Sequence, residues 1–141
     1  MTIRDATRGD ANAIARLLDQ LGYATDADAV SRRLTRLEAS ESDRLFVAEL
    51  DGQVVGLAGI HVSPSVEYDE DAAKISALVV DEAHRRRGIA AALVRRVEEE
   101  ARARGCCVLF LTTAERRKDA HAFYRRAGLE ETGRRFAKRL D

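Results

Sequence analysis

The sequence predicts one α/β domain, residues 1–141, built on a mixed and mostly antiparallel sheet with helices on both faces. Two strand-like segments flank Asp51-Gly52, a dipeptide that strongly favours a tight hairpin turn. Farther along, an apolar strand-like run, a long amphipathic stretch and a second apolar run succeed one another over residues 75–112, which is the order of a crossover between parallel strands. A chain of 141 residues with 45% hydrophobic and 34% charged content is large enough for one core.

Local signals define the elements of the first half. A strand opens the chain, and the helix after it carries apolar residues three and four positions apart until Gly22, a residue type common just past helix ends. Thr25 and Asp26 are capping residues for a second helix. Strands then lie on either side of the predicted turn. The elements expected here are strand 2–6, helix 10–21, a helix from Thr25–Asp26 to about Ala39, strand 45–50 and strand 53–62.

The second half begins with a polar, acidic connection and gives the whole chain the order β-α-α-β-β-β-α-β-α-β. Its long helix has an apolar face and a face rich in arginine and glutamate, and Gly105 marks its end. The run 106–112 is mostly apolar and is expected to be a central strand covered on both sides. The elements expected here are connection 63–71, strand 75–80, helix 88–104, strand 106–112, helix 118–127 and strand 134–140.

Composition excludes several classes of protein. Cys106 and Cys107 are the only cysteines; they are adjacent, cannot build a disulfide framework and are interpreted as small buried hydrophobic residues. The histidines and cysteines lack the spacing of a metal site, so no metal is expected. No apolar run approaches the roughly 20 residues of a membrane helix. The first residues also lack a secretion signal, so we expect a cytoplasmic protein without a membrane partner.

The charge is uneven along the chain although it sums to zero. Residues 1–80 carry a balance of −6 and residues 81–141 a balance of +6, which favours anion binding in the second half. Groups of adjacent arginines at 85–87, 125–126 and 134–135 leave nucleic-acid binding as an alternative, whose sign would be a steep salt dependence. We expect no nucleic-acid partner, because the chain is neutral overall and contains no known reading motif.

A candidate anion site lies between strand 75–80 and the long helix. Three consecutive arginines, Arg85–Arg87, are followed by Gly88 and then by the start of the helix. The first N–H groups of a helix lack partners within the helix and carry the positive end of its dipole, so they bind anions. Gly88 lets a ligand approach the backbone, and guanidinium groups suit phosphate oxygens. The segment predicts a pyrophosphate-binding loop, although it matches neither the Walker loop nor the dinucleotide-binding pattern.

The pattern Arg85-x-x-Gly88-x-Ala90, placed between a Leu-Val-Val strand and a long helix, resembles the acetyl-CoA loop of the GNAT family of N-acetyltransferases. The segment 120–129, which reads Ala-His-Ala-Phe-Tyr-Arg-Arg-Ala-Gly-Leu, is similar to a second signature of that family. Chain length, element order and the predicted hairpin also agree. The resemblance therefore covers nearly the whole chain and implies the GNAT fold.

This resemblance implies that the protein transfers the acetyl group of acetyl-CoA, its co-substrate, to a primary amine. The strand before the loop would pair with the pantetheine arm as with an added strand, and the loop would hold the pyrophosphate. Tyr124 would protonate the leaving thiolate, because a phenol with a pKa of about 10 is protonated at neutral pH. The implied acetyl-CoA contacts are Leu78, Val79, Val80, Arg85, Arg86, Arg87, Gly88, Ile89 and Ala90.

The acceptor side has weaker signals. Family members often carry a glutamate base on the strand before the loop, whereas this strand reads Lys74-Ile-Ser76-Ala-Leu and has no carboxylate. Direct attack with proton transfer through water is therefore expected, with Ser76 as one candidate to order the water and Glu67 or Asp69 as alternative bases. The candidate acceptor contacts are Tyr23, Glu67, Tyr68 and Ser76.

Several functional alternatives stay open. An acidic front half favours a cationic small-molecule amine as the acceptor, and a protein or peptide amine is the alternative. The missing carboxylate also allows a degenerate module that binds acyl-CoA without turnover; in such a module, replacing Tyr124 would change nothing. Family members are often dimers, so a homodimer is a further option.

Overall fold

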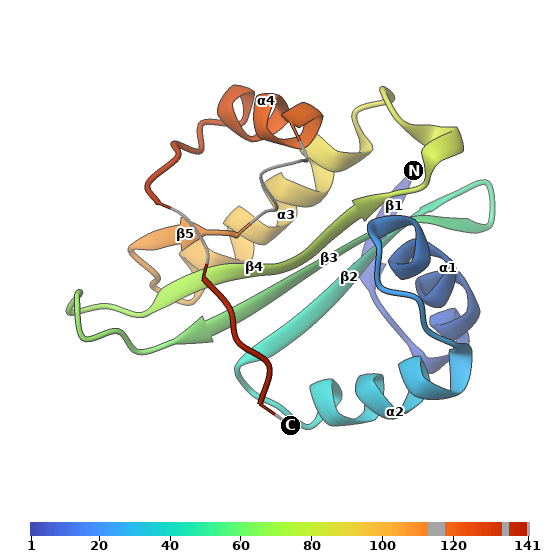
Figure 1. Ribbon diagram of the computed structural model, residues 1–141, viewed down its shortest axis with the longest axis horizontal. Coiled ribbons are helices and arrows are strands. Elements are labelled where there is room, and N and C mark those ends of the chain that lie inside the picture. Colours follow the sequence, from blue (N-terminus) through green and yellow to red (C-terminus); the bar gives the residue numbers. More distant parts are fainter. Residues whose placement is uncertain (113–117, 134–135, 141) are drawn as a thin grey trace.

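Five strands form one sheet in the computed structural model, which describes residues 1–112, 118–133 and 136–140 (Figure 1). The strands follow the order β1-β2-β3-β4-β5. The first four pair antiparallel and β5 pairs parallel to β4, so the sheet is mixed and mostly antiparallel, as predicted. The strands are β1 Thr2–Asp5, β2 Asp43–Leu50, β3 Gln53–Ser63, β4 Ala72–Val80 and β5 Val108–Phe110.

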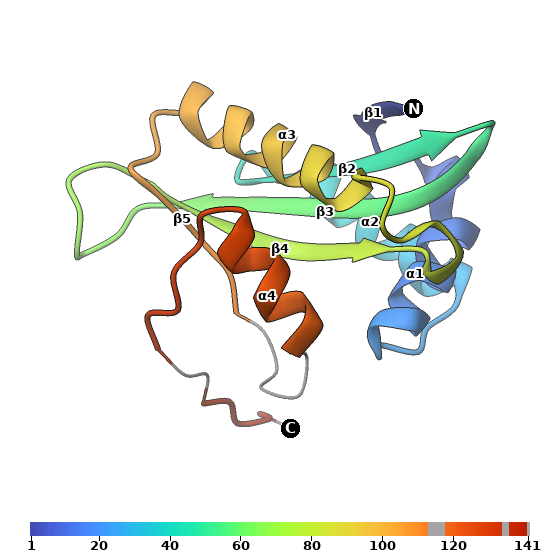
Figure 2. The ribbon, with the colours of Figure 1, turned by 90° about the horizontal axis from the view of Figure 1, so that it is seen from above.

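Helices cover both faces of the sheet, which confirms the predicted layers (Figures 1 and 2). α1 and α2 pack on one face, and α3 packs on the other while it connects β4 to β5. α4 follows β5 and lies on that side of the sheet (Figure 2). The helices are α1 Ala11–Leu21, α2 Ala27–Glu38, α3 Ile89–Ala103 and α4 Lys118–Arg126, with short 3-10 helices at Arg8–Asp10 and Glu82–His84. No helix in the described ranges is long and apolar enough to cross a bilayer.

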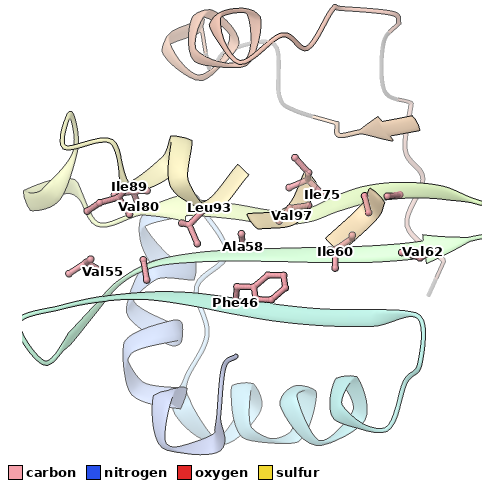
Figure 3. Packing of buried hydrophobic residues seen from close by; sticks show 13 residues of the cluster. Phe46, Val55, Ala58, Ile60, Val62, Ile75, Val80, Ile89, Leu93 and Val97 are labelled. Atoms are coloured by element: carbon pink, nitrogen blue, oxygen red, sulfur yellow. The ribbon is translucent and has the colours of Figure 1, made fainter. Parts of the chain in front are cut away.

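Two hydrophobic cores lie on the two faces because successive strand residues point to opposite sides. The core under α3 contains Phe46 and Ile60 from the sheet and Leu93 and Val97 from the helix (Figure 3). The core under α1 and α2 is built from a second set of buried residues. Its largest members are Leu17, Leu34, Val47 and Leu57.

The helix cap, the helix end and the hairpin turn predicted from the sequence are present in the structure. The Asp26 carboxylate accepts a hydrogen bond of 2.8 Å from the backbone N–H of Ala29 and so caps α2. Gly22 ends α1 with a left-handed φ of 107°. Asp51 and Gly52 form the turn between β2 and β3 with φ values of 51° and 76°, the conformation that a tight hairpin requires.

Three expectations for the second half are wrong. The run 106–112 gives only the short strand β5, at the edge of the described sheet, because Cys106 N–H instead bonds Ala101 in the turn that ends α3. Cys107 is exposed rather than buried. Residues 136–140 form no strand, and Phe136 and Leu140 are 94% and 91% exposed. A strand needs a partner edge and a face to bury, and these residues have neither; residues 134–135 lie outside the described ranges.

A charge cluster fastens α3 to β2. The buried Glu100 carboxylate accepts hydrogen bonds of 2.8 Å from Arg44 on β2 and from Arg104 at the end of the helix. Arg44 and Arg96 stack on the Phe46 ring, at 5.0 and 4.5 Å from its centre. Burial alone would raise the pKa of Glu100. The opposite effect of Arg104 and Arg44 is larger, so the pKa lies below its usual value. Glu100 is therefore ionised at neutral pH and holds the helix that follows the anion loop.

We predict that Gly56→Ala loosens this same helix. A Cβ at Gly56 on β3 would lie 2.9 Å from Leu93 Cδ1 and 3.2 Å from Ile89 Cγ2, which are both buried. The free energy of unfolding should fall by about 1–3 kcal/mol in chemical denaturation. Gly9→Ala is the control, because its Cβ would make only an ordinary contact of 3.6 Å, with Thr7. Equal losses in the two variants would contradict the close approach of α3.

Candidate active site

The sheet opens between β4 and β5. Their described pairs join Ala72, Ala73 and Lys74 with Val108–Phe110, and β4 then continues for six residues to Val80. Within the described part of the chain, the backbone of residues 78–80 has no β5 partner on that side. An extended ligand can pair with such a free edge as an added strand.

The predicted anion loop follows the open half of β4 directly. Arg85, Arg86, Arg87 and Gly88 are exposed, and α3 begins at Ile89 with Gly88 as its N-cap. Arg86 has a φ of 65° and Gly88 one of 77°. The left-handed conformation costs a residue with a side chain about 1–2 kcal/mol, so the loop stores strain at Arg86. Left-handed residues in a tight turn direct neighbouring N–H groups into a common concavity, which suits an anion.

A side-chain network fixes the base of this loop. Gln20 Nε2 of α1 donates a 3.0 Å hydrogen bond to Asp81, and its Oε1 accepts one of 2.9 Å from the N–H of Glu82. The other Asp81 oxygen lies 2.9 Å from His84 Nδ1. Hydrogen bonds from Gln20 and then from His84 lower the pKa of Asp81 below its usual value, against the effect of burial. Sequence analysis missed Gln20 and Asp81 because they are 61 positions apart and no local pattern links them.

A bulge in β4 sets the position of Ser76. Gly59 of β3 pairs with Ala77 and Ile60 pairs with Ile75, so Ser76 is an extra residue between them. A Cβ at Gly59 would collide with Ser76 Oγ and lie 2.8 Å from Leu45 Cδ2. The exposed Ser76 hydroxyl therefore lies over Gly59, on the face that α1 and α2 cover.

A partly open cavity of about 230 Å³ lies on this face, between the two helices and the sheet. Most of its lining is apolar, from Leu18 and Leu37 on the helices to Leu57 on β3. Its polar lining residues are Arg33, Asp43, Arg44 and Ser76. The cavity thus joins the bulge of β4 to a carboxylate on β2 across an apolar floor, which suits a small amine with an apolar body.

The predicted acceptor residues are not brought together. Tyr23 is 61% exposed and follows the end of α1, which bonds to the loop after β4 through Gln20. Glu67 and Tyr68 lie in the connection that precedes β4. These two places are separated by the whole length of β4, about 30 Å at 3.3 Å per residue. One small acceptor cannot contact both groups, and Ser76 lies between them.

Tyr124 lies on α4, beside β5 (Figure 2). Its side chain is half-buried, and its ring meets the Phe123 ring edge-on at 5.8 Å between centres. The Leu129 N–H bonds the Tyr124 carbonyl at 2.9 Å and closes the end of the helix. The helix that carries Tyr124 therefore lies beside β5 (Figure 2).

Comparison with known proteins agrees with this arrangement. The sequence profile of the Acetyltransferase (GNAT) family matches residues 12–129, most of the chain. The chain belongs to the GNAT family of acetyltransferases. Acetyl-CoA is the co-substrate of GNAT enzymes, and the open β4 edge followed by an exposed basic loop fits its pantetheine arm and its pyrophosphate.

Similar GNAT proteins are named for several amine substrates. The chain is 32% identical to an aminoalkylphosphonate N-acetyltransferase of Salmonella typhimurium, over 98% of this chain and 90% of that protein. It is 32% identical to an aminoglycoside N(6')-acetyltransferase type 1 of Stenotrophomonas maltophilia, over 94% and 88% of the two chains. A solved structure of a putative acetyltransferase from Agrobacterium tumefaciens superposes with a TM-score of 0.89 at 25% identity, covering 99% of this chain and 100% of that one.

We predict that Gly88→Ala weakens acetyl-CoA binding by at least about tenfold in calorimetry. The added methyl group would stand where the ligand approaches the backbone. Gly105→Ala is a matched control, because both glycines have a φ of 77° and open space where a Cβ would stand. Both variants should lose about 1–2 kcal/mol of stability from the left-handed conformation, but Gly105 lies past the far end of α3. Equal binding by the two variants would argue against the loop as the pyrophosphate site.

Proposed function

We propose that this protein transfers the acetyl group of acetyl-CoA to the primary amine of a small molecule, by direct attack in a ternary complex. The observation that carries the proposal is the continuity of two features. The edge of Leu78–Val80, which has no β5 partner in the described ranges and where the Val80 carbonyl accepts a 3.5 Å hydrogen bond from Arg85 Nε, leads directly into the basic loop Arg85–Ala90. One face of the fold then holds the donor along β4. The acceptor would reach the same strand from the other face, through the cavity beneath α1 and α2.

The reaction exchanges one bond for another at the thioester carbon. The neutral amine attacks this carbon, the C–N bond forms and the C–S bond breaks. The nitrogen loses a proton and the departing thiolate gains one, so amide and free coenzyme A result. An alkyl amine is mostly protonated at neutral pH, so one further proton must leave the ammonium before attack.

Tyr124 is the proposed acid that protonates the thiolate. Its position on α4, the helix that follows β5, supports this role. A phenol remains protonated at neutral pH and can give its proton to a thiolate, whose conjugate acid has a pKa of about 8.5.

The proposed acceptor is a small amine. A cavity of about 230 Å³ with a carboxylate at one end is too small for a folded protein segment and suits a cationic molecule. Two similar proteins carry the names of aminoalkylphosphonate and aminoglycoside acetyltransferases, which supports the same class. Arg33 also lines the cavity and could pair with an anionic group such as a phosphonate.

A thiol-release assay with acetyl-CoA tests the proposal on aminoethylphosphonate, kanamycin, putrescine and a lysine peptide. Turnover with a small amine and little with the peptide is the expected result. Binding of acetyl-CoA in calorimetry without turnover on any amine would instead make the protein an acyl-CoA-binding module. Turnover on the peptide alone would move the acceptor to protein amines.

We predict that Tyr124→Phe lowers kcat by about 100-fold or more, because general acid catalysis typically contributes 10² to 10⁴. The acetyl-CoA dissociation constant should stay within about twofold of the native value, since only a hydroxyl is removed. Thiol release measures the first quantity and calorimetry the second. An unchanged kcat would remove Tyr124 from the chemistry.

A further inference from the structure

A histidine–carboxylate pair stands at the edge of the acceptor cavity. His61 Nδ1 on β3 lies 3.0 Å from Asp43 Oδ1 on β2. The other carboxylate oxygen of Asp43 accepts a 2.7 Å hydrogen bond from Ser40 Oγ. The side chain of Asp43 is 19% exposed and that of His61 is 43% exposed, so the anchor is largely buried and the ring is accessible.

This contact fixes the tautomer of a neutral His61 ring. A carboxylate accepts but cannot donate, so Nδ1 carries the proton and donates it to Asp43. Nε2 then keeps its lone pair and is the only basic atom of the ring. The same division of labour makes a histidine held by a carboxylate an effective proton acceptor.

The pair lies on the face that α1 and α2 cover, in the row that meets β4 at Lys74, where the described β4–β5 pairs end. His61 pairs with Asp43 on β2 and with Lys74 on β4, so the three residues form one row across the sheet. His61 follows Gly59 by two positions and shares its face, and Ser76 Oγ lies over Gly59. Two strand residues span about 7 Å, a distance that one or two water molecules bridge. Asp43 and Ser76 also line the same cavity.

We propose that His61 is the general base that deprotonates the acceptor ammonium, through water, and that Asp43 and Ser40 are positioning residues for it. The inference rests on the proposed acetyl transfer and supplies the proton acceptor that β4 itself lacks. Lys74 and Ser76 are the side chains on β4 nearest this row, and neither is a carboxylate.

The proton balance is complete with this residue. The ammonium gives one proton through water to Nε2, and the imidazolium is stabilised by Asp43. The neutral amine then forms the C–N bond as the C–S bond breaks. Tyr124 gives a proton to the departing thiolate. The nitrogen loses its second proton as the amide forms, and this proton replaces the one that Tyr124 gave. His61 returns its proton to solvent after product release.

Some charged groups near His61 favour a positive charge on its ring, and others oppose it. Asp43 on β2 favours it, whereas Lys74, directly opposite on β4, opposes it. Arg33 of α2 lines the same cavity as Asp43 and also opposes a positive charge. The charged residues placed near the ring on β2, β4 and α2 are thus Asp43, Lys74 and Arg33.

The test is the pH dependence of kcat in the His61→Asn variant. Asn keeps a donor for Asp43 but cannot accept a proton. With the best small amine of the panel, kcat at pH 7 should fall by about 100-fold. The deficit should shrink toward the native value as the pH rises to about 10, where the alkyl amine deprotonates itself. The native profile should show an acid limb that follows His61, and in the variant this rise should move up to the pKa of the amine, about 10.

Three further measurements make the result specific. The His61 ring, titrated by NMR and assigned from the variant, should change protonation at the midpoint of the kinetic limb. His84→Asn removes a second histidine held by an aspartate, and it should keep the acid limb whatever its effect on acetyl-CoA binding. Asp43→Asn should lower kcat at pH 7 less than His61→Asn and should alter the limb rather than abolish it. Acetyl-CoA binding in calorimetry reports whether each variant is folded.

The outcomes separate this inference from the proposed function. A constant ratio of native to variant rates across pH, or an acid limb that keeps its native midpoint in His61→Asn, overturns the base role while acetyl transfer stands. A native profile without an acid limb overturns it as well. Binding of acetyl-CoA with no turnover on any amine contradicts the proposed function, and the base role falls with it.

Discussion

The early parting of β4 and β5 is the constraint on which the rest of the site depends. Parallel strands in a closed sheet would pair along their whole length, yet the described pairs end at Lys74. The bulge at Ser76 follows within two residues and places its hydroxyl over Gly59, on the face that α1 and α2 cover. An edge with free backbone groups is unfavourable in a buried setting, so it is kept where a ligand or water can satisfy it.

The anion loop is held in place by contacts that lie outside it. α3 begins at the end of the loop and is fixed to β2 by Glu100 and to β3 by its close approach at Gly56. On the other side, Asp81 and Gln20 tie the start of the loop to α1. These contacts offset the strain of Arg86 and hold the helix terminus in place. They also join the donor side to α1, which lines the acceptor cavity.

Sequence reasoning succeeded where the signal is local and failed where it depends on register. Helical spacing, the Asp26 cap and the Asp51-Gly52 turn each act within a few residues, and all are present. The basic loop before α3 is equally local. In contrast, an apolar run of residues does not reveal whether its strand lies at the centre or at the edge of a sheet, so the sequence does not predict the short edge strand β5. The row from Asp43 through His61 to Lys74 exists only once three strands are aligned, and a search for a base along β4 alone could not find it.

Hydrogen–deuterium exchange with and without acetyl-CoA tests most directly whether the open edge of β4 holds the donor. On ligand addition, the backbone amides of residues 78–80 and 86–90 should exchange more slowly, because the pantetheine arm and the pyrophosphate would accept their hydrogen bonds. Amides of β1 and β2 should be unaffected. Protection confined to α1 and α2, or none in residues 78–80 at saturating acetyl-CoA, would contradict the account.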